Sequence, residues 1–531
     1  MMRPVPVTAV MVGEPPKPLI ALKAERTEVQ HKVNAIPTAR IVLSVEGDAL
    51  EDLITFQEEI AFCSAGQKVE VLLHEPDDRG HLIFRGVIVR QELSMTRART
   101  ELVLHLRHDL QKLQNTHRSQ LFENMTDAVI ATNLLVAQGI ALLHVEGMSV
   151  EHDQLVQFRC SDWHFMRHRL GVNGVWAFPN PEGVEIAPPR LAPQPARTLR
   201  QRASVPGQDT LIEEGAWTFS EQFQPSVLTA SSWNDHAQIN DTVTGVATQL
   251  GSGAFNCAHG HEINDVPWSF NYSTPLRLDE TTALAKGLLM NFQSSRASGE
   301  FLIDGSAHYA LGQTLGIEGF GRAFDGGAII TGIRHRIAKG EGWRTLLTLG
   351  YDDVLREPMS MPRACGLHIG VVCAFKEDPD GMHRLQVRLP VLGESSNAVW
   401  ARLAKPYASA TSGFCFYPEV GDEVVVGFFD EDPSYPVILG SMHNPLNPAP
   451  IEPDAGNFVK ALVVSHEGQQ YQLRFDTQGQ AVSLSSPHEQ LSLKQGGELQ
   501  TDSTLTLKCS SLTLSGQTSV SIEGPKIDFS S

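Results

Sequence analysis

The stretch from Ser503 to Phe529 reads STLTLKCSSLTLSGQTSVSIEGPKIDF, and its apolar residues come in pairs two positions apart. Over the last fifty residues the pairs are Val482/Leu484, Leu491/Leu493, Leu505/Leu507, Leu512/Leu514, Val520/Ile522 and Ile527/Phe529. A period of two puts both members of a pair on one face of a β-strand. The pattern therefore predicts a series of short strands, each with one apolar face.

This tail contains no second sheet or helix that could cover those faces. Burying one apolar side chain contributes about 1.5–3 kcal/mol, whereas ordering one residue costs about 1–2 kcal/mol of backbone entropy. Because most of the tail is polar, a single copy falls short, and we expect several copies to pack around a shared axis as a β-helix or β-prism. The residues expected to face this axis are Leu505, Leu507, Leu512, Leu514, Val520 and Ile522. A disordered polar tail is the alternative, although disorder would not keep the alternation in register as far as Phe529.

Composition argues against several classes of protein. The chain has 531 residues, enough for three or more domains, and its net charge of −19 argues against a general nucleic-acid binder or a protein attracted to anionic membranes. The seven cysteines are dispersed without a CxxC pair, as expected for free thiols in a reducing compartment. Prolines interrupt the N-terminal residues and no apolar run reaches the roughly 18–20 residues of a membrane span, so we expect no N-terminal secretory signal.

The remainder of the chain reads as β-rich segments interrupted by a few helices. Residues 17–115 and 300–350 contain alternating, strand-length segments, and helices are predicted over 124–138, 161–170 and 279–297. Residues 365–443 contain about five short strands, which fit a small barrel of the OB type. Glu377, Asp378 and Asp380 are interpreted as turn residues of this barrel and not as a catalytic pair.

Three motifs carry a family resemblance. FCFYPEVGDEVVV at residues 414–426 and FDEDPSYPVILGSMHN at residues 429–444 closely resemble the OB-fold of VgrG spike proteins from type VI secretion and of related phage tail spikes. QFRCSDWHF at residues 157–165 resembles the serine-aspartate-tryptophan helix of the VgrG hub. The resemblance implies a mainly β protein made of two hub β-barrel-like domains with a few helices, an OB-fold and a short C-terminal trimeric β-helix or β-prism.

The implied modules cover almost the whole chain. Residues 1–362 would be a phage-hub-like region that docks on a tube, residues 363–443 an OB-fold collar, residues 444–456 a linker and residues 457–531 the β-helical shaft. A short shaft with nothing appended most resembles the spike of extracellular contractile injection systems, such as the Photorhabdus virulence cassette and the antifeeding prophage. A type VI VgrG or a phage tail spike is the alternative.

The resemblance implies a mechanical function and a set of partners. A homotrimer would join a hexameric tube and a baseplate to a membrane-piercing shaft, and it would be neither an enzyme nor a nucleic-acid binder. Other expected partners are a PAAR-type tip protein, effector cargo and, transiently, the target-cell membrane. The residues expected to contact the tip protein are Ile527, Asp528, Phe529, Ser530 and Ser531. The protein would be made in the bacterial cytoplasm and become part of a phage-tail-like particle released from the cell.

One cluster has the composition of a metal site. Cys257, His259 and His261 are residue types that zinc accepts, but no second group of ligands follows at a defined spacing. We therefore interpret this segment as a polar loop and expect no metal, no cofactor and no catalytic residue. The alternatives from other classes are a cell-wall hydrolase, a metalloenzyme that uses this cluster, and a monomeric carbohydrate-binding β protein.

Overall fold

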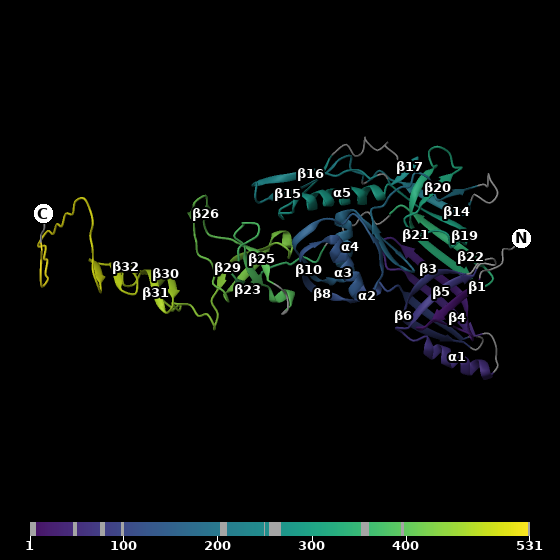
Figure 1. Ribbon diagram of the computed structural model, residues 1–531, viewed down its shortest axis with the longest axis horizontal. Coiled ribbons are helices and arrows are strands. Elements are labelled where there is room, and N and C mark those ends of the chain that lie inside the picture. Colours follow the sequence, from purple (N-terminus) through teal and green to yellow (C-terminus); the bar gives the residue numbers. More distant parts are fainter. Residues whose placement is uncertain are drawn as a thin grey trace. The chain divides into compact units, whose positions relative to one another are not determined.

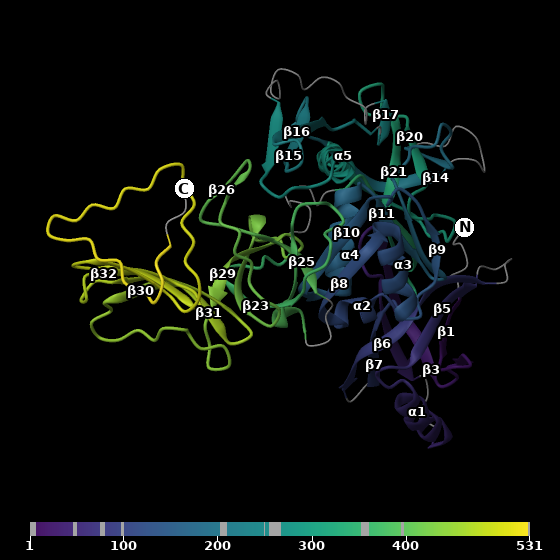
Figure 2. The same ribbon diagram turned by 60° about the vertical axis from the view of Figure 1, so that its left-hand side comes forward.

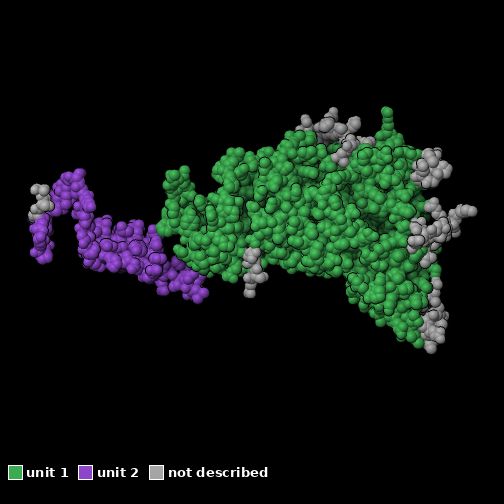
Figure 3. Space-filling model, in the orientation of Figure 1, with its two compact units in different colours: residues 1–442 green, residues 443–531 purple. Residues whose placement is uncertain are grey.

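The computed structural model describes residues 7–45, 50–74, 80–96, 100–201, 210–222, 224–248, 250–253, 267–351, 361–393 and 398–528 (Figure 1). The chain divides into two compact units, residues 1–442 and residues 443–531, which are coloured green and purple in Figure 3. Strands dominate both units, as the sequence predicts. None of the helices in these ranges combines the length and the apolar character that crossing a membrane would require.

A single hydrogen-bonded sheet of 14 strands forms the framework of the hub, the part of the first unit that precedes the OB-fold. Its order is β2-β1-β5-β6-β7-β4-β3-β21-β20-β13-β14-β19-β22, and β17 pairs with β21. The first half comprises β1 (Val7–Val12), β2 (Lys17–Pro18), β3 (Leu22–Lys32), β4 (Thr38–Val45), β5 (Lys68–His74), β6 (His81–Met95) and β7 (Thr100–Arg107). The second half comprises β13 (Arg197–Arg200), β14 (Thr210–Phe219), β17 (Gly251–Gly253), β19 (Ala297–Asp304), β20 (Thr314–Glu318), β21 (Gly326–Ala338) and β22 (Gly342–Leu349).

Each half of this sheet encloses its own apolar core. In the first half, alternate residues such as Ile41 on β4 and Leu104 on β7 point into one buried cluster, with helix α1 (Leu50–Phe62) packed beside it. In the second half, β21 pairs with both β20 and β22, so β21-β20-β13-β14-β19-β22 closes into a barrel around Phe301 and Leu347. The long strand β21 joins the halves because it also pairs with β3.

Two smaller layers cover the hub. The first contains α2 (Gln111–Asn115), β8 (His117–Thr126), α3 (Asp127–Ala137), β9 (Leu142–Val145), β10 (Glu151–Ser161), α4 (Asp162–Asn173), β11 (Trp176–Asn180) and β12 (Gly183–Ala187). The second contains β15 (Leu228–Asn234), β16 (Ile239–Thr244), β18 (Trp268–Tyr272) and α5 (Leu278–Ser294). Helices α4 and α5 meet at two glycines: a Cβ on Gly287 would lie 2.3 Å from the carbonyl oxygen of Gly171. Figure 2 shows α4 and α5 from a second direction.

The OB-fold closes the first unit. Its strands are β23 (His368–Ala374), β24 (Leu385–Arg388), β25 (Val399–Leu403), β28 (Glu423–Phe428) and β29 (Pro436–Met442), with the small hairpin β26 (Ala408–Ser409) and β27 (Ser412–Gly413). They form a closed barrel in the order β23-β24-β25-β29-β28. The predicted five-stranded OB-type barrel is therefore confirmed.

The second unit is one antiparallel sheet made of successive neighbours. Its strands are β30 (Val459–His466), β31 (Gln469–Asp476), β32 (Ala481–Ser485), β33 (Glu489–Leu493) and β34 (Gly497–Thr501). The predicted strands at Val482/Leu484 and Leu491/Leu493 are present as β32 and β33. Residues 502–528 are described but carry no strand, which differs from the alternation predicted for them. A strand needs a hydrogen-bonded neighbour, and the single chain supplies none to this segment.

Local signals in the sequence account for several details. The three predicted helices are α3, α4 and α5, and Ser161 caps α4 by accepting a hydrogen bond of 3.1 Å from the His164 N–H. Asp378 accepts hydrogen bonds from the backbone N–H groups of Asp380 and Arg384, which confirms its interpretation as a turn residue. The six cysteines within the described ranges are free thiols.

Candidate functional site

A row of five leucines crosses the sheet of the second unit. Register pairs Leu462 with Leu473, then Leu473 with Leu484, Leu484 with Leu491 and Leu491 with Leu499, so the row runs from β30 to β34. These side chains line a hollow on the sheet face, and Leu484 is 58% exposed. Within the described part of this unit, nothing covers the row. The single sheet therefore presents the uncovered apolar face that the period-two pattern predicts.

The predicted axis residues lie beyond this sheet. Leu505, Leu507, Leu512, Leu514, Val520 and Ile522 belong to the described segment without strands, and each is more than half exposed. The single chain does not bring them together around an axis, so their role stays a prediction about an assembly. Of the predicted tip-contact residues, Ile527 and Asp528 are exposed, whereas Phe529, Ser530 and Ser531 lie outside the described residues.

The predicted metal-like cluster cannot be placed, because Cys257, His259 and His261 lie outside the described residues. Among the residues that the structure does describe, no group of three or more His, Cys, Asp or Glu side chains has an arrangement that could hold a metal ion.

A buried network of charged side chains ties four elements of the hub together. Arg169 on α4 donates hydrogen bonds to Asp127 at the start of α3 (2.7 and 2.9 Å) and to Glu280 on α5 (3.1 Å). His152 on β10 lies 3.3 Å from Asp127, and Asn173 donates to the same carboxylate at 2.7 Å. Burial disfavours the Asp127 carboxylate, but Arg169 and His152 outweigh it and hold the pKa of Asp127 well below its usual value.

The same network reaches the OB-fold. Tyr435, which follows β28, lies with its hydroxyl 3.5 Å from Glu280, and burial together with that carboxylate raises the pKa of Tyr435 well above its usual value. Burial also raises the pKa of the neighbouring Asp432. The Tyr435 hydroxyl therefore contacts the same carboxylate that Arg169 holds inside the hub.

Two further contacts hold the barrel against the hub. Asp430 accepts four hydrogen bonds from the N–H and hydroxyl groups of Ser273 and Thr274 (2.5 to 2.9 Å), and it does so with φ +51°, a left-handed conformation uncommon outside glycine. Gln154 on β10 donates to the carbonyl oxygens of Trp400 (3.1 Å) and Ser434 (2.8 Å). These hydrogen bonds connect the OB-fold to two separate parts of the hub, strand β10 and the segment between β18 and α5.

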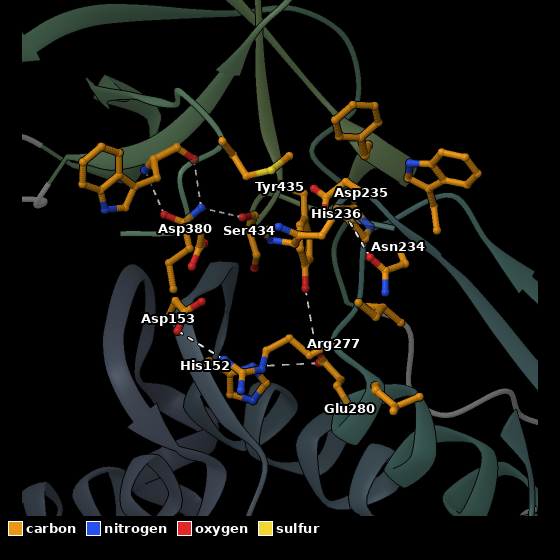
Figure 4. A pocket seen from close by; sticks show the side chains of 18 of the residues that line it. His152, Asp153, Asn234, Asp235, His236, Arg277, Glu280, Asp380, Ser434 and Tyr435 are labelled. Atoms are coloured by element: carbon orange, nitrogen blue, oxygen red, sulfur yellow. Dashed lines mark hydrogen bonds and ion pairs between the residues drawn. The ribbon is translucent and has the colours of Figure 1, made fainter. Parts of the chain in front are cut away.

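A pocket of about 1020 Å³ lies at this junction (Figure 4). Its charged residues are largely paired: Arg277 lies 3.4 Å from Asp153, Arg402 lies 3.6 Å from Asp235, and Asp380 bonds Arg384. Figure 4 shows Tyr435 and His152 converging on Glu280 at its base. Carboxylates held by arginines suit a structural joint better than proton transfer, which needs a group free to change its protonation state.

Most of this junction has no recognisable signal in the sequence. Arg169 and Glu280 are 111 positions apart, and neither stands in a recognisable motif. Asp430, by contrast, lies inside the FDEDP segment that supports the resemblance, so its contact could have been suspected there.

Comparison with known proteins gives the hub a family. The Alg8 N-terminal domain matches residues 17–339, which is more than half of the chain. The chain belongs to the Alg8 N-terminal domain family. A second match, the type VI secretion system/phage-baseplate injector OB domain, covers residues 368–443 and coincides with the closed barrel of this family member.

Two curated relatives are VgrG proteins of Vibrio cholerae. The type VI secretion system spike protein VgrG3 is 31% identical over 130 residues, which cover 23% of this chain and 13% of the relative. The actin cross-linking toxin VgrG1 is 26% identical over 131 residues, which cover 23% of this chain and 12% of the relative. The match thus spans only about an eighth of each relative. The predicted resemblance to VgrG spike proteins is confirmed.

Solved structures share the fold at low sequence identity. The E. coli c3393 protein, described as a type VI secretion component similar to the T4 tail proteins gp27 and gp5, is 13% identical, with a TM-score of 0.50 over 79% of this chain and 97% of that chain. A chain of the lidded Francisella PdpA-VgrG complex is 9% identical, with a TM-score of 0.57 over 93% of this chain and 80% of that chain. These likenesses confirm the mainly β, hub-and-OB architecture.

Proposed function

We propose that this protein is the trimeric spike and hub at the tip of a contractile injection apparatus. Residues 1–362 dock on the tube and baseplate, residues 363–443 form a collar, and residues 457–531 form the piercing shaft after the 444–456 linker. The observation that carries the proposal is the uncovered leucine row from β30 to β34. Three copies that turn these rows toward one axis would bury them against each other, which a single copy cannot do.

The joint between hub and OB-fold supports a mechanical role. A spike that transmits the force of sheath contraction must not bend where its modules meet. The four hydrogen bonds that Asp430 accepts from Ser273 and Thr274 resist such bending, because separating the modules would leave the Asp430 carboxylate without these partners. This function requires shape and rigidity and no catalytic residue.

The protein is made in the bacterial cytoplasm and becomes part of a particle of the extracellular injection type, with a type VI VgrG or a phage spike as the alternative. Its partners are two copies of itself, the tube and baseplate proteins, a PAAR-type tip protein at residues 527–531 and effector cargo. The target-cell membrane is met only transiently.

Matched substitutions on one strand test the trimer. Leu484→Asp places a charge in the leucine row, whereas Ser483→Asp places the same charge on the opposite face of β32. The full-length protein and the Ser483→Asp variant should have the mass of three chains by light scattering. Leu484→Asp should shift the mass toward one chain, because three charges would meet at the axis.

Imaging completes the test. Single-particle images of the wild-type protein should show three-fold symmetry along the shaft. A monomeric wild-type protein with a folded C-terminal unit, or a Leu484→Asp variant that stays trimeric, would contradict the proposal.

A further inference from the structure

The outer face of the hub sheet carries a strip of arginines across five neighbouring strands. Register aligns two rows of side chains over β21, β3, β4, β7 and β6. The first row is Arg336, Glu28, Arg40, His105 and Arg90, and the second is Arg334, Gln30, Thr38, Arg107 and Val87. We call these ten residues the basic face. Their alternation with core residues such as Ile41 and Leu104 directs them away from the apolar cluster.

Positive charge on the basic face exceeds negative charge. Glu28 lies 3.5 Å from Arg334 and 3.7 Å from Arg336, so one carboxylate serves two guanidinium groups. Within the ranges that the structure describes, Arg40 and Arg107 have no ion-pair partner. Glu92 on β6, beside the basic face, pairs with Arg90 and lies 3.5 Å from His105. Five arginines therefore face two glutamates, in a chain whose net charge is −19. Because the chain as a whole is negatively charged, its composition does not explain this local excess of positive charge.

The basic face has a defined edge and a hollow. Beyond β21, Arg344 on β22 is held by Glu213 at 2.7 Å, so the excess of positive charge ends there. A hollow of about 430 Å³ opens on the other side, over β3, β4, β7 and β6, and Arg40, Arg90, His105 and Arg107 line it. Such a recess would let a partner's carboxylates approach several guanidinium groups at once.

The dimensions of the basic face suit a protein partner. Five strands spaced about 4.8 Å apart span about 19 Å, which exceeds a single phosphate or carboxylate group. Glu28 would repel a phosphate backbone, and the ten residues of the face include no Phe, Tyr or Trp side chain on which a base could stack. A protein surface can place carboxylates against the arginines and a donor against Glu28, which a uniform polyanion cannot do.

We propose that the basic face of the hub sheet is a docking surface for an acidic surface of another protein. Guanidinium groups bind carboxylates in pairs of parallel hydrogen bonds, so Arg40 and Arg107 would form the central contacts. The inference rests on the hub sheet alone, and it is independent of whether the shaft trimerises.

Binding of an acidic polypeptide tests the docking surface. The full-length protein is titrated at low ionic strength into a fluorescein-labelled oligo-glutamate long enough to span the five strands, and anisotropy is recorded. We expect saturable binding that weakens with added salt. Arg40→Glu should weaken it by about tenfold or more, and Arg107→Gln should weaken it in the same direction by a smaller factor.

The control is Arg322→Glu, the same charge reversal at an exposed arginine outside the basic face. It should bind as the wild type does, and thermal melting of all variants checks that the hub remains folded. Absence of binding by the wild type, or equal loss in Arg40→Glu and Arg322→Glu, would overturn the proposal. A single-stranded oligonucleotide of matched charge that binds the basic face more tightly than oligo-glutamate would also overturn it, in favour of nucleic acid.

Discussion

Arg169 holds Asp127 with two parallel hydrogen bonds, from Nε to Oδ1 at 2.7 Å and from Nη2 to Oδ2 at 2.9 Å, in the buried centre of the hub. Both groups are desolvated, and each keeps its charge because the other is present. The pair therefore holds α4 against α3, because separating the two helices would leave each buried charge without its partner.

Removing one partner of this pair should be strongly destabilising. Arg169→Met leaves the Asp127 carboxylate buried without its main counter-charge, and we expect a loss of about 3–5 kcal/mol in the free energy of unfolding. Denaturant-induced unfolding of the hub measures it. The comparison is Lys68→Met, which breaks an exposed ion pair with Glu14 and should change stability by less than about 1 kcal/mol. Equal effects of the two substitutions would contradict the role assigned to the network.

Acidification should destabilise the hub through its buried histidines. Burial lowers the pKa of His108 to about 4, and the Leu110 N–H donates to its Nδ1 at 3.2 Å, which requires that nitrogen to be unprotonated. In the unfolded chain His108 binds a proton near pH 6.5, whereas in the folded chain it stays neutral until the pH falls to about 4. Stability is therefore full above about pH 6.5 and falls as the pH drops toward 4.

The melting temperature should accordingly be lower at pH 5 than at pH 7. His108→Gln should reduce this difference, by an amount equivalent to about 2 kcal/mol at pH 5. His236→Gln, at an exposed position, should leave the difference unchanged. If His108→Gln and the wild type show the same dependence on pH, His108 is not the group responsible.

Crowding between α4 and α5 should reverse the usual effect of alanine in a helix. Replacing a helical glycine by alanine ordinarily stabilises by about 1 kcal/mol. At Gly287 the added methyl group would lie 2.3 Å from the Gly171 carbonyl oxygen, so we expect Gly287→Ala to lower the melting temperature of the hub. Lys286→Ala, at an exposed position on the same helix, is the matched control and should have little effect. A more stable Gly287→Ala variant would show that the helices can move apart at no cost.

The predicted shaft axis has its own test. Leu507 is 60% exposed in the single chain, so Leu507→Asp should leave the folding of each chain intact while weakening trimerisation of the shaft. Thr506→Asp places the charge on the neighbouring position of opposite parity and should be tolerated. Native mass spectrometry and melting of the trimer report the difference. A Leu507→Asp protein with unchanged trimer and unchanged melting would remove Leu507 from the axis.

Features that depend on residues close together in the sequence could be predicted, whereas contacts between residues far apart in the sequence could not. Alternation over Ile41–Leu43 or Leu102–Leu106 is a local pattern, and strands β4 and β7 lie within the range 17–115 where strands were predicted. The cap at Ser161 and the turn at Asp378 are local as well. Arg169, Asp127 and Glu280 meet only after three elements have packed, and no single segment records that meeting. The strands predicted beyond Thr501 need neighbours that one chain does not contain.

The sheet of the second unit has consequences for the time before assembly. Within the described residues, β30 pairs only with β31 and β34 only with β33, so both outer strands have unused hydrogen-bonding groups beside the row from Leu462 to Leu499. Open edges next to exposed leucines are a template for any other unpaired strand. We therefore expect a newly made chain to aggregate through these strand edges and exposed leucines unless other copies of the chain cover them first. Because only other strands can cover these edges, assembly and aggregation compete from the moment the second unit folds.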